Sequence, residues 1–157
     1  MSNLQRIAQI TLDENTVIRR SPDIEHERRI AIYDLLEANG FQPVGEFEGP
    51  YNVLMGMEEN RLVLNIRNSD DDPLTRVLVP LMPFRRIIKD YFTICESYFQ
   101  AIKSAQPSKI EAIDMGRRGL HNDGSDLLRE RLDGKIIVDN ETARRLFTLI
   151  CILQIRS

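Results

Sequence analysis

The sequence predicts an α+β protein, in which an antiparallel β-meander of about four strands packs against a long central helix and precedes a helical C-terminal half. Short β-like runs fill residues 41–81, a long amphipathic segment starts at Pro83, and helical patterns dominate the rest. The 157 residues, 42% apolar and 29% charged, have the size and composition of one globular domain. We therefore expect a single domain over residues 1–157.

The N-terminal part predicts a strand followed by a helix. Residues 4–14 alternate loosely between apolar and polar side chains, which favours a first strand at an edge of the sheet. A helix is expected next, because Ser21 stands as an N-cap, Pro22 takes the first helical position and Gly40 follows the end. Opposite its main apolar stripe, a second, half-apolar face offers three candidates for an interface: His26, Ile30 and Tyr33.

The predicted meander consists of four runs, at residues 41–47, 51–57, 61–68 and 75–81. The turns between them are too short for the crossover that parallel neighbours require, so antiparallel pairing is expected. The acidic turn at residues 70–72 lacks the glycine and the distal glutamate of a calcium loop. We interpret it as a solvated hairpin.

The C-terminal half is expected to hold four helical segments, with a short strand at residues 135–138. These segments start at Pro83, at Ser108 (ending near Met115), at Ser125 and after a cap at Asp139. The last helix is apolar on nearly every side, so it must be buried in the fold or against another subunit. A homodimer is the simplest way to cover it.

The segment DMGRRGLHNDGSD, residues 114–126, is the part of the chain most suggestive of a chemical site. If a helix continued through it, four polar side chains would stack on one face: Asp114, Arg117, Arg118 and His121. His121 and Asp114 are then the catalytic candidates, as a base and the carboxylate that orients it, and the arginines are anion-binding candidates. If the glycines break the helix, the segment is only a polar joint between helices, and this is the interpretation that we favour.

The same segment contains GRRG at residues 116–119, a pattern with which KH domains clamp a nucleic-acid backbone. The polar and acidic residues after it do not fit the apolar second helix of such a domain. The formal charge of −3 also argues against nucleic acid as a partner. RNA binding through this loop is the weakest of the alternatives.

Two further basic clusters stand at helix starts, where the helix dipole is already positive: Arg85, Arg86 and Lys89 in the long helix, and Arg144 and Arg145 in the last. A bound phosphate or an acidic partner would offset this placement, and so would acids of the chain itself. We favour pairing within the chain, by Asp90 or Glu96 for the first cluster and Glu141 for the second. Arg85 and Arg86 remain anion-binding candidates.

No cofactor and no metal site is predicted. The chain has no GxGxxG or P-loop pattern, no CxxC, and no metal-binding spacing around its two histidines. Cys95 and Cys151 lie in apolar helical patterns, which indicates a reducing compartment. No secretory signal is visible, and the most apolar run, residues 146–155, is about half of what a bilayer requires. We expect a cytoplasmic protein without a membrane-spanning segment.

Several stretches carry a resemblance to a known family, among them SPDIEHERRIAIYDLLE, PFRRIIKDYFTICESYFQAI and IEAIDMGRRGLHNDGS. With these segments the chain resembles, over nearly its full length, uncharacterised protein family 0262, small proteins of alphaproteobacteria. The resemblance implies a bacterial cytoplasmic protein of one domain. It implies no particular reaction, substrate or cofactor.

The sequence favours a non-enzymatic cytosolic protein that acts by binding another protein or itself. The alternative is a small enzyme, or a binder of phosphate or another small anionic molecule, that uses residues 114–126. The alternative requires the polar side chains of that segment to converge on one pocket.

Overall fold

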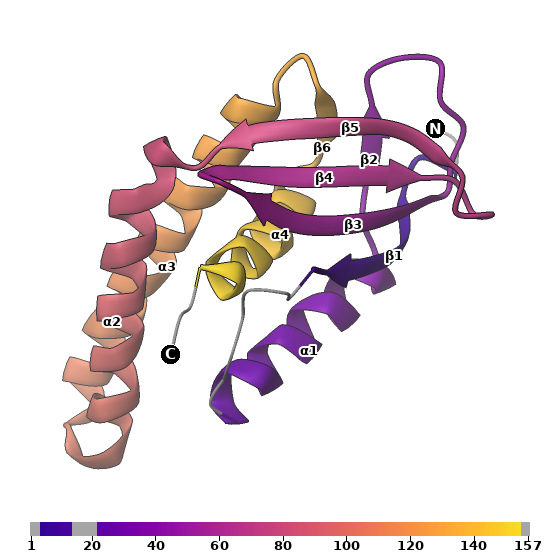
Figure 1. Ribbon diagram of the computed structural model, residues 1–157. Helices are drawn as coiled ribbons and strands as arrows, with labels where there is room; N and C mark the ends of the chain where they lie inside the picture. The colour runs from indigo at the N-terminus through magenta and orange to yellow at the C-terminus, as the bar shows by residue number, and fades with distance from the viewer. Residues whose placement is uncertain (1–3, 14–21, 155–157) are drawn as a thin grey trace.

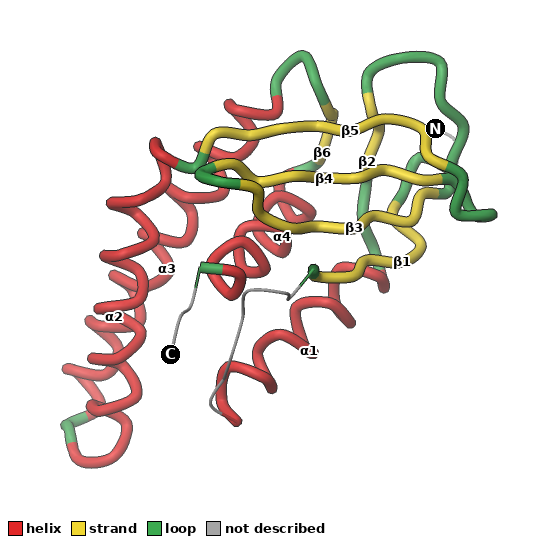
Figure 2. Tube along the Cα trace, in the orientation of Figure 1, coloured by secondary structure: helices red, strands yellow, loops and turns green. Residues whose placement is uncertain are grey.

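The computed structural model describes residues 4–13 and 22–154, and in this part of the chain it has four α-helices and two β-sheets (Figures 1 and 2). The main sheet has the strand order β1-β3-β4-β5, formed by Ile7–Leu12, Tyr51–Glu58, Arg61–Arg67 and Pro73–Pro80. β3, β4 and β5 are the antiparallel meander that short turns predict. The α+β class is therefore confirmed, and the first strand lies at an edge of the sheet.

One strand of the predicted meander is wrong. Only β2 (Phe41–Pro43) forms in the run at residues 41–47, and it pairs with β6 (Ile136–Val138) in a separate antiparallel sheet. Pro43 has no N–H for a ladder, and Gly45, at φ 130°, turns the chain in a conformation that other residues rarely adopt. The fourth place in the main sheet goes to β1, which runs parallel to β3, with α1 (Pro22–Glu37) in the connection.

The next two helices form a long antiparallel pair. A turn of 3₁₀ helix, η1 (Met82–Phe84), leads into α2 (Arg85–Ser104), and Pro107 both follows the end of α2 and opens α3 (Pro107–Leu132). α3 is continuous, so the predicted joint at residues 114–126 is wrong. The Ser21 cap predicted for α1 lies outside the described residues.

The helix α3 contains three internal glycines, which have low helix propensity. Tertiary packing and ion pairs compensate for this cost. Each glycine costs about 1 kcal/mol relative to alanine. A Cβ at Gly124 would collide with the buried ring of Phe147, so this glycine permits α3 to approach the last helix closely. Asp114 bonds residues three and four positions later, which supports the helix across Gly116.

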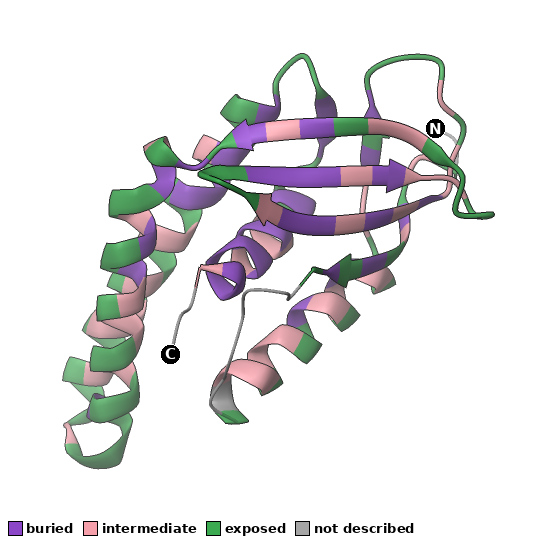
Figure 3. Cartoon of the chain, viewed as in Figure 1, coloured by how far each residue is buried: buried purple, intermediate pink, exposed green. Residues whose placement is uncertain are grey.

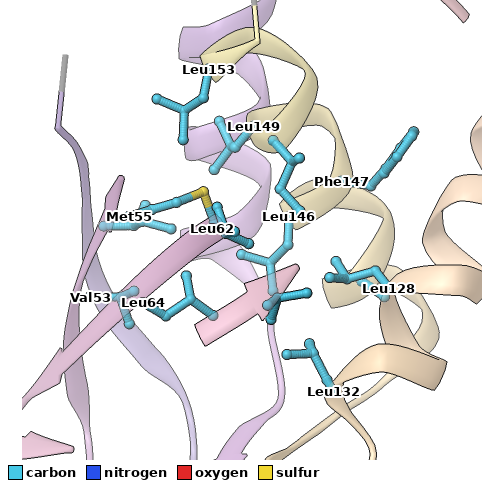
Figure 4. Close-up of a cluster of buried hydrophobic side chains, with 14 of the residues drawn as sticks. Val53, Met55, Leu62, Leu64, Leu128, Leu132, Leu146, Phe147, Leu149 and Leu153 are labelled. Carbon is cyan, nitrogen blue, oxygen red and sulfur yellow. The ribbon is translucent and has the colours of Figure 1, made fainter. Parts of the chain in front are cut away.

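The last helix, α4 (Asn140–Leu153), is the centre of the core. The Asp139 carboxylate accepts a hydrogen bond from the Thr142 N–H at 2.7 Å, which confirms the predicted cap. In Figure 4, Leu146, Leu149 and Leu153 lie toward the sheet, with Met55, Leu62 and Leu64 opposite them, while Leu128 and Leu132 approach from α3. The predicted burial of α4 is confirmed, and it occurs within the chain. The apolar faces of α4 therefore give no reason for a second subunit, and the homodimer remains an untested expectation.

Figure 3 shows that burial concentrates where the sheet, α4 and the adjoining end of α3 meet, and that α2 and α3 are mostly exposed toward their far ends. In Figure 1 these two helices extend side by side away from the sheet, and α1 lies on the other side of α4. α4 packs against both α1 and α3. None of the helices described combines the length and the apolar character needed to span a membrane.

Candidate functional site

A cavity of about 230 Å³ is lined by residues of α1, α2, α3 and α4. We call it the arginine cleft, after four lining side chains: Arg117 and Arg118 from α3, and Arg144 and Arg145 from α4. Other polar groups of its lining are Glu27 and Asp34 of α1, Tyr91 of α2, His121 of α3 and Thr148 of α4. The continuous helix thus brings three of the predicted site residues, Arg117, Arg118 and His121, into one pocket.

Asp114 does not line the cleft, but it pairs with both arginines of α3. Its carboxylate accepts hydrogen bonds from Nε and Nη2 of Arg117 at 3.1 and 2.7 Å, and it lies 3.0 Å from Nη2 of Arg118. The hydrogen bond from Arg117, ahead of the charges of both arginines, lowers the pKa of the Asp114 carboxyl. The Arg117 guanidinium also lies 4.8 Å from the centroid of the Tyr98 ring. These contacts fix Arg117 more firmly than Arg118, whose side chain is 70% exposed.

His121 is held as a neutral ring. Its Nε2 lies 2.8 Å from Oγ1 of Thr148, and that hydroxyl donates to the Arg144 carbonyl oxygen at 3.2 Å. The hydroxyl has one proton, so which of the two groups donates in the contact with Nε2 depends on the tautomer of the ring. Nδ1 is buried, with no hydrogen-bond partner among the described residues.

The surroundings of His121 disfavour its charged form. The ring makes edge contacts with Tyr91 and Phe147, at centroid distances of 5.5 and 5.3 Å. Burial, followed by the charges of Arg144, Arg117 and Arg145, lowers the pKa of His121 to about 4. The imidazole therefore adds no positive charge to the arginine cleft at neutral pH.

The predicted partnership of His121 with Asp114 is not found among the contacts of the described residues. Asp114 engages the arginines that lie between the two positions, and Nε2 of His121 engages Thr148. Seven helical residues correspond to a rise of about 10 Å, too far for a hydrogen bond between the two side chains. A general base also needs an accessible ring nitrogen, and Nδ1 is buried while Nε2 is engaged by Thr148.

The two arginines of α4 pair with acids of the chain, as expected. Arg144 lies 3.9 Å from Glu141 and also contacts the Asn122 amide oxygen. Arg145 lies 4.0 Å from Glu141 and 3.9 Å from Asp34, which joins α4 to α1. These distances indicate loose ion pairs, so the guanidinium groups keep donors that face the cleft.

The remaining candidates lie elsewhere. Arg85 reaches Asn60 at 3.3 Å, and Arg86, 93% exposed, lies 3.9 Å from Asp90, both at the sheet end of α2. The second face of α1 is exposed, as expected for an interface: His26, Ile30 and Tyr33. Of these, only Ile30 lines the arginine cleft.

Sequence reasoning missed the acidic wall of the cleft, Glu27 and Asp34, as well as Tyr91 and Thr148. The two acids stand seven residues apart, a spacing that places them on one helix face and was available as a signal. Tyr91 and Thr148 carried no local signal. The GRRG pattern lies inside α3 and forms no loop, so the backbone-clamping geometry expected for RNA binding is not present. No group of three or more metal-binding side chains occurs among residues 4–13 and 22–154.

Comparisons with known proteins show that nearly the whole chain is similar to one group of bacterial proteins. The family model described as "Uncharacterised protein family (UPF0262)" matches residues 4–156. A UPF0262 protein of Paramagnetospirillum magneticum is 59% identical over 156 residues, 99% of each chain. Another, of Rhodospirillum rubrum, is 56% identical over 99% of this chain and 96% of its own length. One of Rhodopseudomonas palustris is 60% identical over 94% of this chain and 91% of its own. No solved structure matches.

Proposed function

The chain belongs to the uncharacterised protein family UPF0262, and we propose that it binds a small ligand bearing a carboxylate or a phosphate in the arginine cleft. The observation that carries this proposal is the convergence of four arginine side chains, from two helices, on one cavity of about 230 Å³. Guanidinium groups match carboxylate and phosphate oxygens with paired N–H donors. The cytoplasm is the compartment in which we expect this binding.

Binding, and not acid–base catalysis, is the role that the contacts of His121 support. Its Nε2 is engaged by Thr148 and its Nδ1 is buried, so neither nitrogen is available to move a proton of a ligand. The ring instead positions Thr148 and, through it, the backbone of α4 at Arg144.

Calorimetric titration with inorganic phosphate and with short carboxylates tests the proposal. We expect saturable binding to the wild-type protein, and at least a tenfold loss of affinity in Arg118→Gln and in Arg144→Gln, since each removes a charged donor from the cleft. Arg86→Gln is the matched control, because Arg86 is also an exposed helix arginine, but lies outside the cleft. Equal affinities in all four proteins would place the bound anion elsewhere and contradict the proposal.

A second candidate, favoured by sequence, is binding of another protein or of a second copy through α1. The observation behind it is the exposure of two large side chains on one face of this helix, Ile30 at 45% and Tyr33 at 65%. Aromatic side chains of this kind are frequent anchors of interfaces.

Sedimentation velocity over a range of micromolar concentrations tests the self-association form of this candidate. Tyr33→Asp should shift the population to monomer, whereas Ile137→Asp should leave it unchanged, because Ile137 is 60% exposed on β6 instead of α1. Two results together would exclude this candidate. The wild-type protein would be monomeric at every concentration, and pull-downs with the wild-type protein and with Tyr33→Asp would capture no protein that distinguishes them.

A further inference from the structure

We infer that α1 binds α1 of a second copy of the chain, in an antiparallel pair about a two-fold axis at Tyr33, with Arg29 of each copy on Glu37 of the other. This inference rests on the second candidate of the proposed function, the use of α1 as an interface, and it names the partner and the pairing. Three observations support it: the exposed face of α1, the positions of the two charges on that face, and the symmetry that a pair of identical helices requires.

One face of α1 is open to solvent along the length of the helix. Its members are the residues of α1 that the structure describes as exposed: Pro22, His26, Arg29, Ile30, Tyr33 and Glu37. The opposite face packs into the core through Ala31 and Leu35, which are both buried. In Figure 1, α1 lies at the outside of the molecule, on the other side of α4 from α2 and α3. A second chain can therefore approach this face without displacing another described helix or strand.

The two charged residues of this face have opposite signs and stand at equal distances from Tyr33. Arg29 precedes Tyr33 by four residues and Glu37 follows it by four, which is about 6 Å along the helix in each direction. The three side chains lie on one ridge, because residues four positions apart are neighbours on a helix surface. Arg29 and Glu37 are about 12 Å apart, so they cannot pair with each other within one helix.

A two-fold axis at Tyr33 turns this arrangement into two identical ion pairs. In an antiparallel pair of identical helices, a residue that precedes the axis lies opposite the residue that follows it by the same number of positions in the other copy. Arg29 of each copy then lies opposite Glu37 of the other. In a parallel pair each residue would lie opposite its own equivalent, and like charges would meet. The charges therefore favour the antiparallel pair.

Both side chains are free to form these ion pairs. The ion pairs in which the described part of α1 takes part involve other side chains, and none includes Arg29 or Glu37. The Glu37 carboxylate does interact with Tyr33 of its own helix, through a hydrogen bond that raises the pKa of the Tyr33 hydroxyl. A carboxylate accepts several hydrogen bonds, so Glu37 can also accept those of a guanidinium group.

Two large exposed side chains form the centre of the pair, Tyr33 and Ile30. The two Tyr33 rings meet at the axis, and Ile30 of each copy packs beside them, so the pair buries apolar surface together with its charges. Stable interfaces usually bury about 1,200–2,000 Å². One face of a helix of 16 residues provides a smaller area. We therefore expect a weak dimer, with a dissociation constant on the order of tens of micromolar.

Charge reversal tests the pair in the full chain. Arg29→Glu and Glu37→Arg should each weaken the dimer about tenfold in sedimentation equilibrium, because each reversal replaces two attractive contacts by two repulsive ones. The protein that carries both substitutions should return to the wild-type dissociation constant. Arg131→Glu is the matched control, since it makes the same reversal at an exposed position of α3, and it should leave the dimer unchanged.

Mixing the two single variants tests the antiparallel geometry directly. Arg29→Glu places two acids on the face and Glu37→Arg places two cations there, so a mixed dimer regains both ion pairs. An equimolar mixture should associate about tenfold more tightly than either variant alone. A mixture that associates no more tightly than its components would overturn the inference.

The substitutions exchange residues of good helix propensity, and circular dichroism measures whether the helix content is kept. If a single variant loses helix content, the salt dependence of the wild-type dimer decides. Salt screens exposed ion pairs, so the dimer should weaken as the salt concentration rises. A dimer whose dissociation constant is the same at low and high salt would overturn the pairing of Arg29 with Glu37.

The outcomes separate this inference from the candidate on which it rests. A wild-type protein that stays monomeric at every concentration would overturn the inference and leave α1 as an interface for a different protein. A dimer that Tyr33→Asp disperses, but that both charge reversals leave unchanged, would keep α1 as the interface and overturn the antiparallel pairing. A dimer that none of these substitutions weakens would overturn both.

Discussion

At the scale of the residue, His121 is a polar side chain that lines the cleft and contacts Thr148 while it remains uncharged at neutral pH. Its hydrogen bond to Thr148 and its contacts with Tyr91 and Phe147 leave the ring partly buried among groups that do not stabilise a cation. The nearby charges of Arg144, Arg117 and Arg145 add to this effect. The consequence is a stability that depends on pH.

The protein should lose stability as the pH falls from about 6.5 to about 4. In this range an unfolded chain protonates His121 and the folded chain, with its pKa lowered to about 4, does not. Protons therefore favour unfolding, and the loss should reach on the order of 3 kcal/mol, with no further contribution from this residue at lower pH. Urea unfolding at pH 7 and pH 4.5 measures it.

His121→Gln serves as the control for this pH dependence, since glutamine has no proton to gain. The difference in unfolding free energy between the two pH values should shrink in this variant by most of the His121 contribution. If the variant lost as much unfolding free energy at low pH as the wild-type protein does, groups other than His121 would cause the loss.

The sequence predicted the stacking of Arg117, Arg118 and His121 only on the condition that the helix continued. Given that condition, the spacing of three and four residues was sufficient to place Asp114 with its arginines. The partner of His121 was out of reach, because Thr148 lies 27 residues away on another helix. The spacing of residues in the sequence predicts contacts within one helix, whereas a cleft between helices depends on contacts between residues that are far apart in the sequence.

At the scale of the element, the glycines of α3 have different roles. A Cβ at Gly119 would have no atom within 4 Å, apart from its own helix, whereas one at Gly124 would enter the Phe147 ring. The first glycine therefore only weakens the helix, and the second permits the packing of α3 on α4.

Gly119→Ala should stabilise the protein by about 0.5–1 kcal/mol, because alanine restricts the unfolded chain and fits the helix. Gly124→Ala should destabilise it by about 1–3 kcal/mol, since the added methyl group displaces a fully buried ring. Urea titration followed by circular dichroism at 222 nm measures both. Two substitutions with the same sign would contradict the assignment of roles.

The cap of α4 gives a second prediction for an element. Asp139→Ala should cost about 1 kcal/mol of unfolding free energy, because the Thr142 N–H loses its acceptor at the start of the helix. Asp139→Asn should retain most of the stability, as asparagine also caps. A loss of similar size in both variants would indicate that the charge, and not the hydrogen bond, provides the stabilisation.

The contrast between α4 and α3 explains which elements could be predicted. The cap and the continuous apolar pattern of α4 are local, and both were recognised. The continuity of α3 was missed because the cost of its glycines is local, whereas the compensating contact with Phe147 belongs to the tertiary structure. The parallel pairing of β1 with β3 was missed for the same reason, since it joins segments that are about 40 residues apart.

At the scale of the whole molecule, α4 connects the sheet, α1 and α3 through one core. We therefore expect the described part of the chain to unfold as a single unit, in agreement with the expected single domain. Leu149→Ala, at the centre of that core, should lower the unfolding free energy by about 2–5 kcal/mol.

Hydrogen exchange under native conditions tests this unity. In Leu149→Ala, the slowest amides of β4 in the sheet and of Leu128–Leu132 in α3 should accelerate by a similar factor. An exposed position such as Ile137, changed to alanine, should leave both at the wild-type rate. Acceleration confined to the sheet or to the helices would divide the molecule into two units.

The pairing of β2 with β6 and the position of α4 also bear on how the protein is made. β2 ends at Pro43, its partner starts at Ile136, and the core helix follows directly after it. A nascent chain on the ribosome can complete the β3–β5 meander early, but the α4 side chains that pack toward that sheet, among them Leu146 and Leu149, are absent until residues 140–153 have been synthesised. α4 therefore completes both the core against the sheet and the lining of the cleft, so the fold cannot be complete before residues 140–153 have been synthesised.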